Sequence, residues 1–235
     1  MSKKIYISPS DQNRNIYATG NTNEMVQCQK IGKALASALV RCGFEAKSND
    51  TDEMEERVAE SNAWGANLHV CIHTNAFNGE VKGTRMFSYD TSGEGYQACK
   101  QVMATLSPIT PGKSDNITAY PGLYEVRNAE APTVYIEVAF HDNKEEAAWI
   151  IAHTDDIAEA ICEGVCNHYK VKYIPHKDEK PATKDEKPVT KDYIYRVFDA
   201  AGKQVGAYGN ESNAFNAVKK QLQTSGKASI TYGER

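Results

Sequence analysis

The chain has 235 residues, of which 40% are hydrophobic and 25% charged, and its formal net charge is −4. This length predicts one medium domain and a second, smaller one. The negative charge argues against binding to nucleic acid, and no apolar run is long enough for insertion into a membrane. Two lysines at the N-terminus lead straight into a strand-like segment without the apolar region of a signal peptide, which predicts synthesis in the cytosol.

Strand-like and helix-like segments alternate through the first 170 residues. The expected strands are 4–8, 44–47, 68–73, 83–89 and 133–138, and the expected helices are 23–42, 51–64, 93–106, 145–151 and 154–169. This alternation predicts an α/β fold, with a mainly parallel twisted sheet and helices on both faces. The active site of such a sheet forms beyond the carboxyl ends of its strands.

A charged, proline-containing segment interrupts this pattern at 174–192. The sequence KDEKPAT at 177–183 is followed by KDEKPVT at 184–190, with Val189 as the only large apolar residue. Such a segment buries too little surface to offset the entropy of ordering, so we expect a tether. The tether would separate a domain at 1–173 from a small α+β module of ββαβ order at 193–235, with strands at 193–198, 204–208 and 228–232 and a helix at 211–224.

The cysteines show no CxxC pairing, and two of them, Cys162 and Cys166, share one face of an expected helix. This spacing occurs in some metal sites, but no further ligands lie beside the pair in the sequence. A free thiol in an apolar pattern usually packs as a small hydrophobic side chain. Packing is therefore the favoured interpretation for all six: Cys28, Cys42, Cys71, Cys99, Cys162 and Cys166.

Polar residues with possible chemistry follow or open several of these elements. His73 ends an apolar strand, where a neutral imidazole is well placed to bind a metal. His69 points to the same side of that strand but lies deeper, as a core histidine would. Glu24 opens the first long helix, where a carboxylate is also favoured simply by the helix dipole.

Glu137 lies inside an apolar strand, where an unpaired carboxylate is costly. Burial raises the pKa of a carboxyl group toward neutrality, which makes Glu137 a candidate general base beside a metal. A structural salt bridge is the alternative, but no lysine or arginine is near in the sequence. His141 follows in the loop after the strand and is a candidate metal ligand, transition-state donor or helix-capping residue.

From residue 5 to about residue 169 the sequence resembles the zinc-dependent N-acetylmuramoyl-L-alanine amidases of the type-3 class, found in bacterial autolysins and phage endolysins. Three features carry the resemblance: the helix start NTNE, which ends in Glu24, the strand end IHTNA around His73, and the segment APTVYIEVAF, which contains Glu137. Their order, spacing and structural context match the family together. The resemblance implies that Glu24 and His73 are zinc ligands and that Glu137 is the catalytic base.

The first strand departs from the family's pattern. The family usually supplies its first zinc histidine there, in an Asp-Pro-Gly-His-Gly context, whereas this chain has ISPSDQ at 7–12, with Asp11 at the expected position. Zinc accepts a carboxylate, and Gln12 is a poorer ligand. His141 could fill the position from the opposite loop. Because nitrogen suits zinc better, His141 is predicted as the third ligand ahead of Asp11, and a site that lacks the third ligand is the further alternative.

The resemblance implies a peptidoglycan hydrolase that uses zinc to cleave the amide bond between N-acetylmuramic acid and L-alanine. One alternative is a zinc peptidase acting on the stem peptide, and another is a non-catalytic wall-binding protein. The absence of a signal region favours release at lysis, as for a phage or prophage endolysin, with bacterial peptidoglycan as the partner.

The segment 193–235 faintly resembles small sheet-and-helix domains that bind glycan chains, such as the sporulation-related repeat. It carries six basic and three acidic residues, and a basic surface with tyrosines suits an anionic wall polymer. A folded appendage or a dimerisation element is the alternative.

Overall fold

The structure, a computed structural model, describes residues 2–49, 53–176 and 193–208, together with 217, 218, 220, 222, 227 and 229–234. The chain divides into two compact units, Met1–His176 and Lys177–Arg235. The tether repeats at 177–190 lie outside the described residues, so the division into domain, tether and module stays a prediction. Within the described residues, no helix combines the length and the apolar character needed to cross a membrane.

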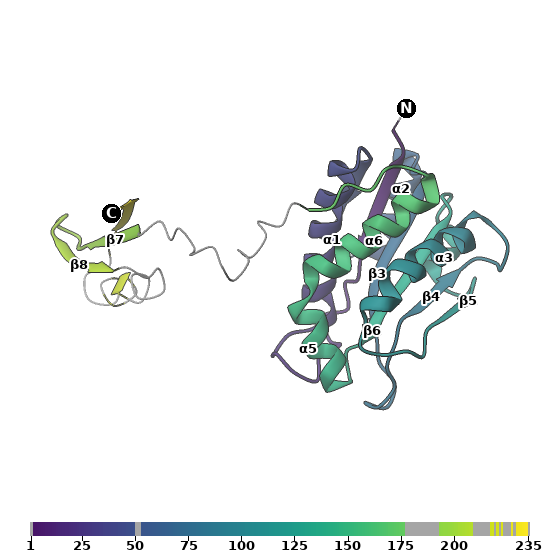
Figure 1. The fold of residues 1–235 in the computed structure, drawn as a ribbon, viewed down its shortest axis with the longest axis horizontal. Helices are drawn as coiled ribbons and strands as arrows, with labels where there is room; N and C mark the ends of the chain where they lie inside the picture. The colour runs from purple at the N-terminus through teal and green to yellow at the C-terminus, as the bar shows by residue number, and fades with distance from the viewer. Residues whose placement is uncertain are drawn as a thin grey trace, which may run out of the picture. The chain divides into compact units, whose positions relative to one another are not determined.

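Strands and helices alternate through the first unit (Figure 1). The strands are β1 Lys4–Pro9, β2 Glu45–Ser48, β3 Leu68–Asn75, β4 Arg85–Ser88, β5 Asn116–Ala119 and β6 Thr133–Phe140. The α-helices are α1 Glu24–Arg41, α2 Met54–Trp64, α3 Glu94–Leu106, α4 Tyr124–Asn128, α5 Lys144–Ala152 and α6 Thr154–Tyr169, and a short 3-10 helix spans Ser107–Ile109.

The strands form one six-stranded sheet in the order β2-β1-β3-β6-β4-β5. The neighbours β2, β1, β3 and β6 are parallel, whereas β4 runs antiparallel to β6 and β5 runs parallel to β4. The sheet is therefore mainly parallel, as predicted. The carboxyl ends of β1, β3 and β6 meet at one edge, which is where a site is expected.

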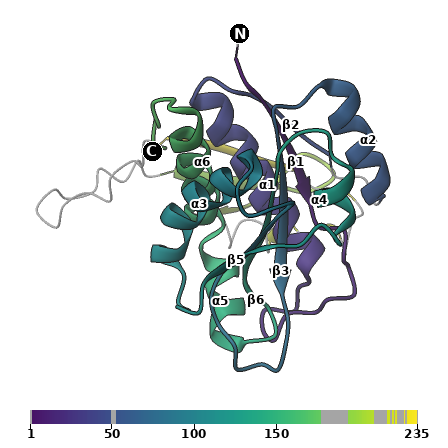
Figure 2. The same ribbon diagram turned by 90° about the vertical axis from the view of Figure 1, so that its right-hand side faces the viewer.

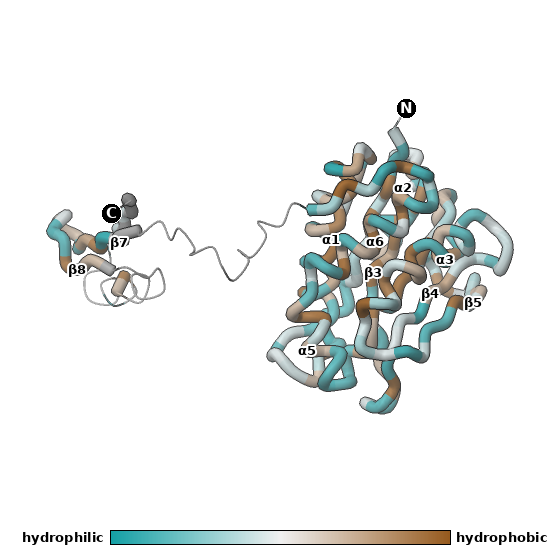
Figure 3. Tube along the Cα trace, viewed as in Figure 1, coloured by the Kyte–Doolittle hydropathy of each residue, from teal (hydrophilic) through white to brown (hydrophobic). Residues whose placement is uncertain are grey.

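Helices cover both faces of the sheet, also as predicted (Figure 2). One face packs against α1, α3 and α6 in the main hydrophobic core, whose members include Leu35, Ile72, Val134 and Ile161. The other face carries a small cluster of Cys71, Val126 and Tyr135 beside α4. The most hydrophobic stretches of the trace run through the inner strands and the helix faces packed on them (Figure 3). The side of the sheet with the smaller core leaves room for polar side chains.

Three local features differ from the predicted elements. The short elements β5 and α4 were not predicted, because four or five residues are too few for a periodic pattern to stand out. Helix α2 begins at Met54 with Glu53 as its N-cap and without a side-chain cap. Its predicted start at residue 51 was therefore too early, and the proposed cap Thr51 lies outside the described residues.

The second unit contains three described strands, β7 Tyr193–Phe198, β8 Gln204–Tyr208 and β9 Ser229–Glu234. They form an antiparallel sheet in the order β8-β7-β9. Of the helix expected at 211–224, only residues 217, 218, 220 and 222 are described, and they are helical. The complete ββαβ module stays a prediction.

Candidate functional site

The neighbouring strands β3 and β6 bring two of the predicted site residues together. His73 and Glu137 are partners in the register of these parallel strands, so their side chains leave the same face of the sheet. The His73 ring stacks on Tyr135, with ring centroids 4.5 Å apart. The site thus lies on the α4 side of the sheet, at the carboxyl ends of β3 and β6.

Glu24 reaches this edge from the first turn of α1. The helix begins there because the Asn23 side chain accepts a hydrogen bond from the Val26 backbone at 3.0 Å, which is a favourable N-cap. Oε1 of Glu24 lies 2.9 Å from Nδ1 of His73, and Oε2 accepts a hydrogen bond from Asn15 at 2.6 Å. Burial raises the pKa of Glu24, but the hydrogen bonds with His73 and Asn15 outweigh it and hold the pKa below its usual value.

Glu137 has a free carboxylate oxygen in the same place. Its Oε2 atom is buried and has no hydrogen-bond partner. Arg85 is its register partner on the other side, yet the Arg85 guanidinium donates to the Thr84 carbonyl and the Ser114 hydroxyl instead. Burial raises the pKa of Glu137 to about 7, with the charge of His73 opposing the rise and that of Glu24 adding to it. A carboxyl group with this pKa suits proton transfer near neutral pH.

Glu125, in the short helix α4, is a site residue that the sequence did not reveal. It is 1% exposed, and Oε2 lies 3.7 Å from Nε2 of His73. Its Oε1 atom lies 3.2 Å from Nε2 of His69 and hydrogen-bonds to the Ser8 hydroxyl. In the sequence, Glu125 is an acid among apolar residues. This pattern is common on protein surfaces, so it does not indicate a site residue.

His69 behaves as a core histidine. Its Nδ1 atom lies 2.9 Å from the Ser61 hydroxyl, and Nε2 lies against Glu125. His69, Cys71 and Glu125 are near enough to one another to hold an ion together. Because both ring nitrogens of His69 already have partners, this group serves better as the support of the Glu125 carboxylate.

The loop after β1 directs Gln12, and not Asp11, toward His73. The Gln12 amide nitrogen lies 3.4 Å from Nδ1 of His73, and its oxygen accepts a hydrogen bond from Asn15 at 2.7 Å. Asp11 instead forms an ion pair with Nη1 of Arg57 at 3.1 Å. Arg57 is 1% exposed and also donates to the Ser8 hydroxyl at 2.8 Å.

His141 lies in the loop after β6 and is 4% exposed. Its Nδ1 atom lies 2.9 Å from the Thr74 carbonyl oxygen and 3.0 Å from the Thr74 hydroxyl. The ring stacks on Tyr17 with centroids 5.3 Å apart. Because Thr74 follows His73 in the strand, their side chains alternate between the two faces. His141 is thus held at the end of β3 by Thr74, the neighbour of His73 in the chain.

The balance of charge around His73 favours a cation. Three carboxylates, those of Glu24, Glu125 and Glu137, surround this one imidazole. Burial alone would lower the pKa of His73, but the neighbouring carboxylates of Glu125 and Glu24 outweigh it and raise the pKa to about 10. Nε2 of His73 and one oxygen each of Glu125 and Glu137 are buried without a hydrogen-bond partner. Imidazole and carboxylate donors are the set that zinc accepts, so His73 and the carboxylates around it, Glu24 among them, fit a zinc ion.

A histidine and acids at the carboxyl edge of a mainly parallel sheet suit a hydrolytic enzyme of the α/β class. The sequence profile of the N-acetylmuramoyl-L-alanine amidases, Amidase_3, matches residues 8–167. This match covers most of the first unit and the whole site, so the chain belongs to the N-acetylmuramoyl-L-alanine amidase family.

Two characterised relatives are similar over most of this chain. The amidase LytC of Bacillus subtilis is 26% identical over 183 residues, which are 72% of this chain and 36% of LytC. The endolysin of Bacillus phage SPP1 is 28% identical over 201 residues, 78% of this chain and 74% of the endolysin. The chain therefore matches only about a third of the length of LytC but most of the phage protein.

Solved structures share the fold. The catalytic domain of CwlV, an amidase from Bacillus (Paenibacillus) polymyxa var. colistinus, has a TM-score of 0.65 at 18% identity and covers 72% of this chain and 99% of that domain. The amidase AmiC2 of Nostoc punctiforme has a TM-score of 0.62 at 20% identity, covering 72% of this chain and 97% of that one. The likeness confirms the predicted α/β architecture of the first unit.

Proposed function

We propose that the chain is a zinc-dependent N-acetylmuramoyl-L-alanine amidase that hydrolyses the amide bond between N-acetylmuramic acid and L-alanine in peptidoglycan. Membership of the amidase family supports this choice of the bond that is cleaved. The observation that carries the chemistry is the buried site in which three glutamates face His73, with unpartnered atoms on Glu125, Glu137 and His73. Such an excess of acceptors is stable only with a proton or a cation among them.

Glu24 and His73 would hold the zinc ion, because the Glu24 carboxylate faces Nδ1 of His73. Bound zinc would polarise the scissile carbonyl and lower the pKa of a water molecule. Glu125 would orient His73 through the opposite ring nitrogen, Nε2. Metal-binding histidines usually donate their second N–H group to a carboxylate or carbonyl in this way.

Glu137 would act as the general base. Its unpartnered oxygen and its pKa of about 7 allow it to accept a proton from the attacking water and to pass that proton to the leaving amine. His141, fixed by Thr74 and Tyr17, would donate a hydrogen bond to the oxyanion of the tetrahedral intermediate.

The identity of the third zinc ligand is the part of the proposed site that departs most from the family's pattern. His141 was predicted for this role ahead of Asp11, and both assignments remain untested. Gln12 is the better supported candidate, since its amide lies near Nδ1 of His73, and a rotation of the amide exchanges its nitrogen and oxygen. Asp11, in contrast, is paired with Arg57.

We therefore expect Gln12→His to bind zinc more tightly than the natural chain, because imidazole is a better zinc ligand than an amide. Gln12→Ala should bind zinc more weakly. Asp11→Asn should leave the zinc affinity unchanged, and His141→Ala should slow turnover while zinc stays bound. Zinc titration of the four variants, followed by activity at saturating zinc, tests this order. If only His141→Ala or only Asp11→Asn sharply lowers the zinc affinity, then that residue is the third zinc ligand.

The products of purified wall distinguish the reaction from its alternatives. An amidase releases new L-alanine amino termini and leaves lactyl groups free on muramic acid. We expect mass spectrometry of digested wall to find these ends. New termini inside the stem peptide would identify a zinc peptidase instead. Wall binding without cleavage by the zinc-loaded chain would identify a non-catalytic wall-binding protein.

We further propose that the segment 193–235 binds the cell wall and that the enzyme acts there after lysis. The excess of basic over acidic residues in this segment would hold the enzyme on an anionic wall polymer. The likeness to the phage SPP1 endolysin supports a role as a phage or prophage lytic enzyme that reaches the wall after release from the cytoplasm.

A further inference from the structure

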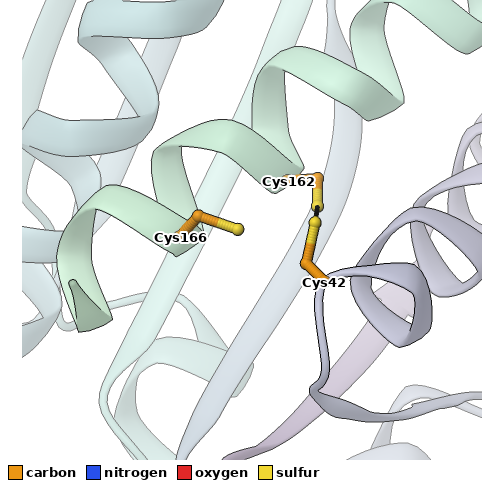
Figure 4. A group of neighbouring side chains, drawn as sticks. All are labelled: Cys42, Cys162 and Cys166. Carbon is orange, nitrogen blue, oxygen red and sulfur yellow. Dashed lines mark hydrogen bonds between the residues drawn. The ribbon is translucent and has the colours of Figure 1, made fainter. Parts of the chain in front are cut away.

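Three cysteines that are distant in the sequence meet inside the first unit. Cys162 and Cys166 lie on α6, one turn apart, and Cys42 is the C-cap residue of α1. Cys162 and Cys166 are fully buried, and Cys42 is 5% exposed. Figure 4 shows the side chain of Cys42 pointing from the end of α1 toward Cys162, with Cys166 on the next turn of α6. The sequence showed the helical pair but not the third member.

The distances between the three sulfur atoms suit a common metal ion. The Sγ atoms of Cys42 and Cys162 are 3.7 Å apart, and all three sulfurs lie within 4.8 Å of one another. In a tetrahedral site with Zn–S bonds of about 2.3 Å, neighbouring sulfurs are separated by about 3.8 Å. One pair therefore already has the required spacing, and a small side-chain movement of Cys166 would complete the set.

The cluster lies beside one backbone N–H donor and close to the residue that precedes Cys42, Arg41. The Ile174 backbone N–H donates to Sγ of Cys42 at 3.3 Å. Arg41 donates from Nε to the Ile174 carbonyl at 2.8 Å, and its guanidinium is fixed by an ion pair with Glu159 at 2.6 Å. Burial raises the pKa of the Cys42 thiol, so its proton leaves only when a metal ion replaces it, and the Ile174 N–H can then donate to the thiolate.

We propose that Cys42, Cys162 and Cys166 form a second metal site, which binds one soft ion of the zinc class through three thiolates. Binding would release the thiol protons to solvent. The ion would join the end of α1 to α6 and to the stretch at Ile174 that follows α6. It would stabilise the fold as a structural centre, apart from the site around His73.

Cadmium is a suitable probe, because cadmium thiolates absorb in the ultraviolet and carboxylates or imidazoles do not give this band. We expect the reduced full-length chain to develop the band and to reach saturation at one thiolate-bound cadmium ion per chain. His73→Ala should keep the band in full, so the result does not depend on the proposed catalytic zinc. Cys162→Ser and Cys166→Ser should each lose about one third of the band or more, as for one ligand of three.

Two buried cysteines outside the cluster serve as controls. Cys99→Ser should retain the band, and so should Cys71→Ser, which lies in the group with His69 and Glu125. A band that disappears only in Cys71→Ser would overturn the proposal. So would a reduced natural chain that shows no band while its thiols remain free.

A measurement on the natural chain covers the case in which a serine variant fails to fold. The chain is unfolded gradually in urea with and without cadmium, and exposed thiols are alkylated and located by peptide mass. Cadmium should protect Cys42, Cys162 and Cys166 more than Cys99, because coordinated thiolates resist alkylation directly, beyond the protection that a more stable fold gives every buried cysteine. Equal protection of all cysteines, or protection of none, would contradict a site at this cluster.

Discussion

Glu137→Gln is expected to lower the rate of wall hydrolysis by at least about 100-fold, the usual scale of general acid–base catalysis. The amide has nearly the same shape as the carboxylate but cannot accept the proton of the attacking water. Because Oε2 of Glu137 has no hydrogen-bond partner in the protein, the substitution breaks no hydrogen bond of that atom. The fold and the bound zinc should be retained, which thermal unfolding and metal analysis would verify.

Glu130→Gln is the matched control for this experiment. Glu130 is exposed and lies in the segment between α4 and β6, so the same chemical change there should leave hydrolysis of purified walls unchanged. Full activity of Glu137→Gln would refute the assignment of the base. Loss of zinc together with activity would mean that Glu137 is a metal ligand.

Glu125→Gln is expected to weaken zinc binding by about 10- to 100-fold, the range for residues that orient a metal-binding histidine. Removal of the charge leaves Nε2 of His73 without the carboxylate that faces it at 3.7 Å. The amide oxygen can still accept a hydrogen bond from Ser8 or His69, so the fold should survive. Zinc titration and thermal unfolding should be measured on the same preparation.

Comparison of the zinc affinity with the unfolding temperature shows whether Glu125 positions His73 or only stabilises the fold. A positioning role lowers the zinc affinity even where the unfolding temperature of the metal-free protein is unchanged. If Glu125→Gln lowers only the unfolding temperature and binds zinc as before, then Glu125 merely stabilises the buried network with His69 and Ser8. Excess zinc should restore much of the activity if positioning is its role.

The part of the site that could be predicted comes from residues with a clear structural position. His73 and Glu137 belong to long apolar strands, and Glu24 follows a helix-capping asparagine, so strand and helix patterns alone locate them. The parallel order of β1, β3 and β6 then brings strand ends to a common edge. The roles of these residues still rest on the family resemblance and on the experiments above.

The remaining residues depend on contacts that no local pattern encodes. Glu125 lies in a helix of five residues, too short to predict, and its role arises from His69 and His73 on a strand more than fifty residues earlier. Gln12 and Asp11 are adjacent in an irregular loop, and only the buried Arg57 decides which of them turns inward. Cys42 likewise joins the α6 pair only through the packing of α1 on α6.

The ion pair between Asp11 and Arg57 has a consequence for the engineering of this chain. It ties the irregular loop after β1 to helix α2, and the guanidinium is almost completely enclosed. A chimera that received the corresponding loop of a relative without an acid at this position would lose this ion pair, so the loop and α2 would have to be exchanged as one cassette to keep it.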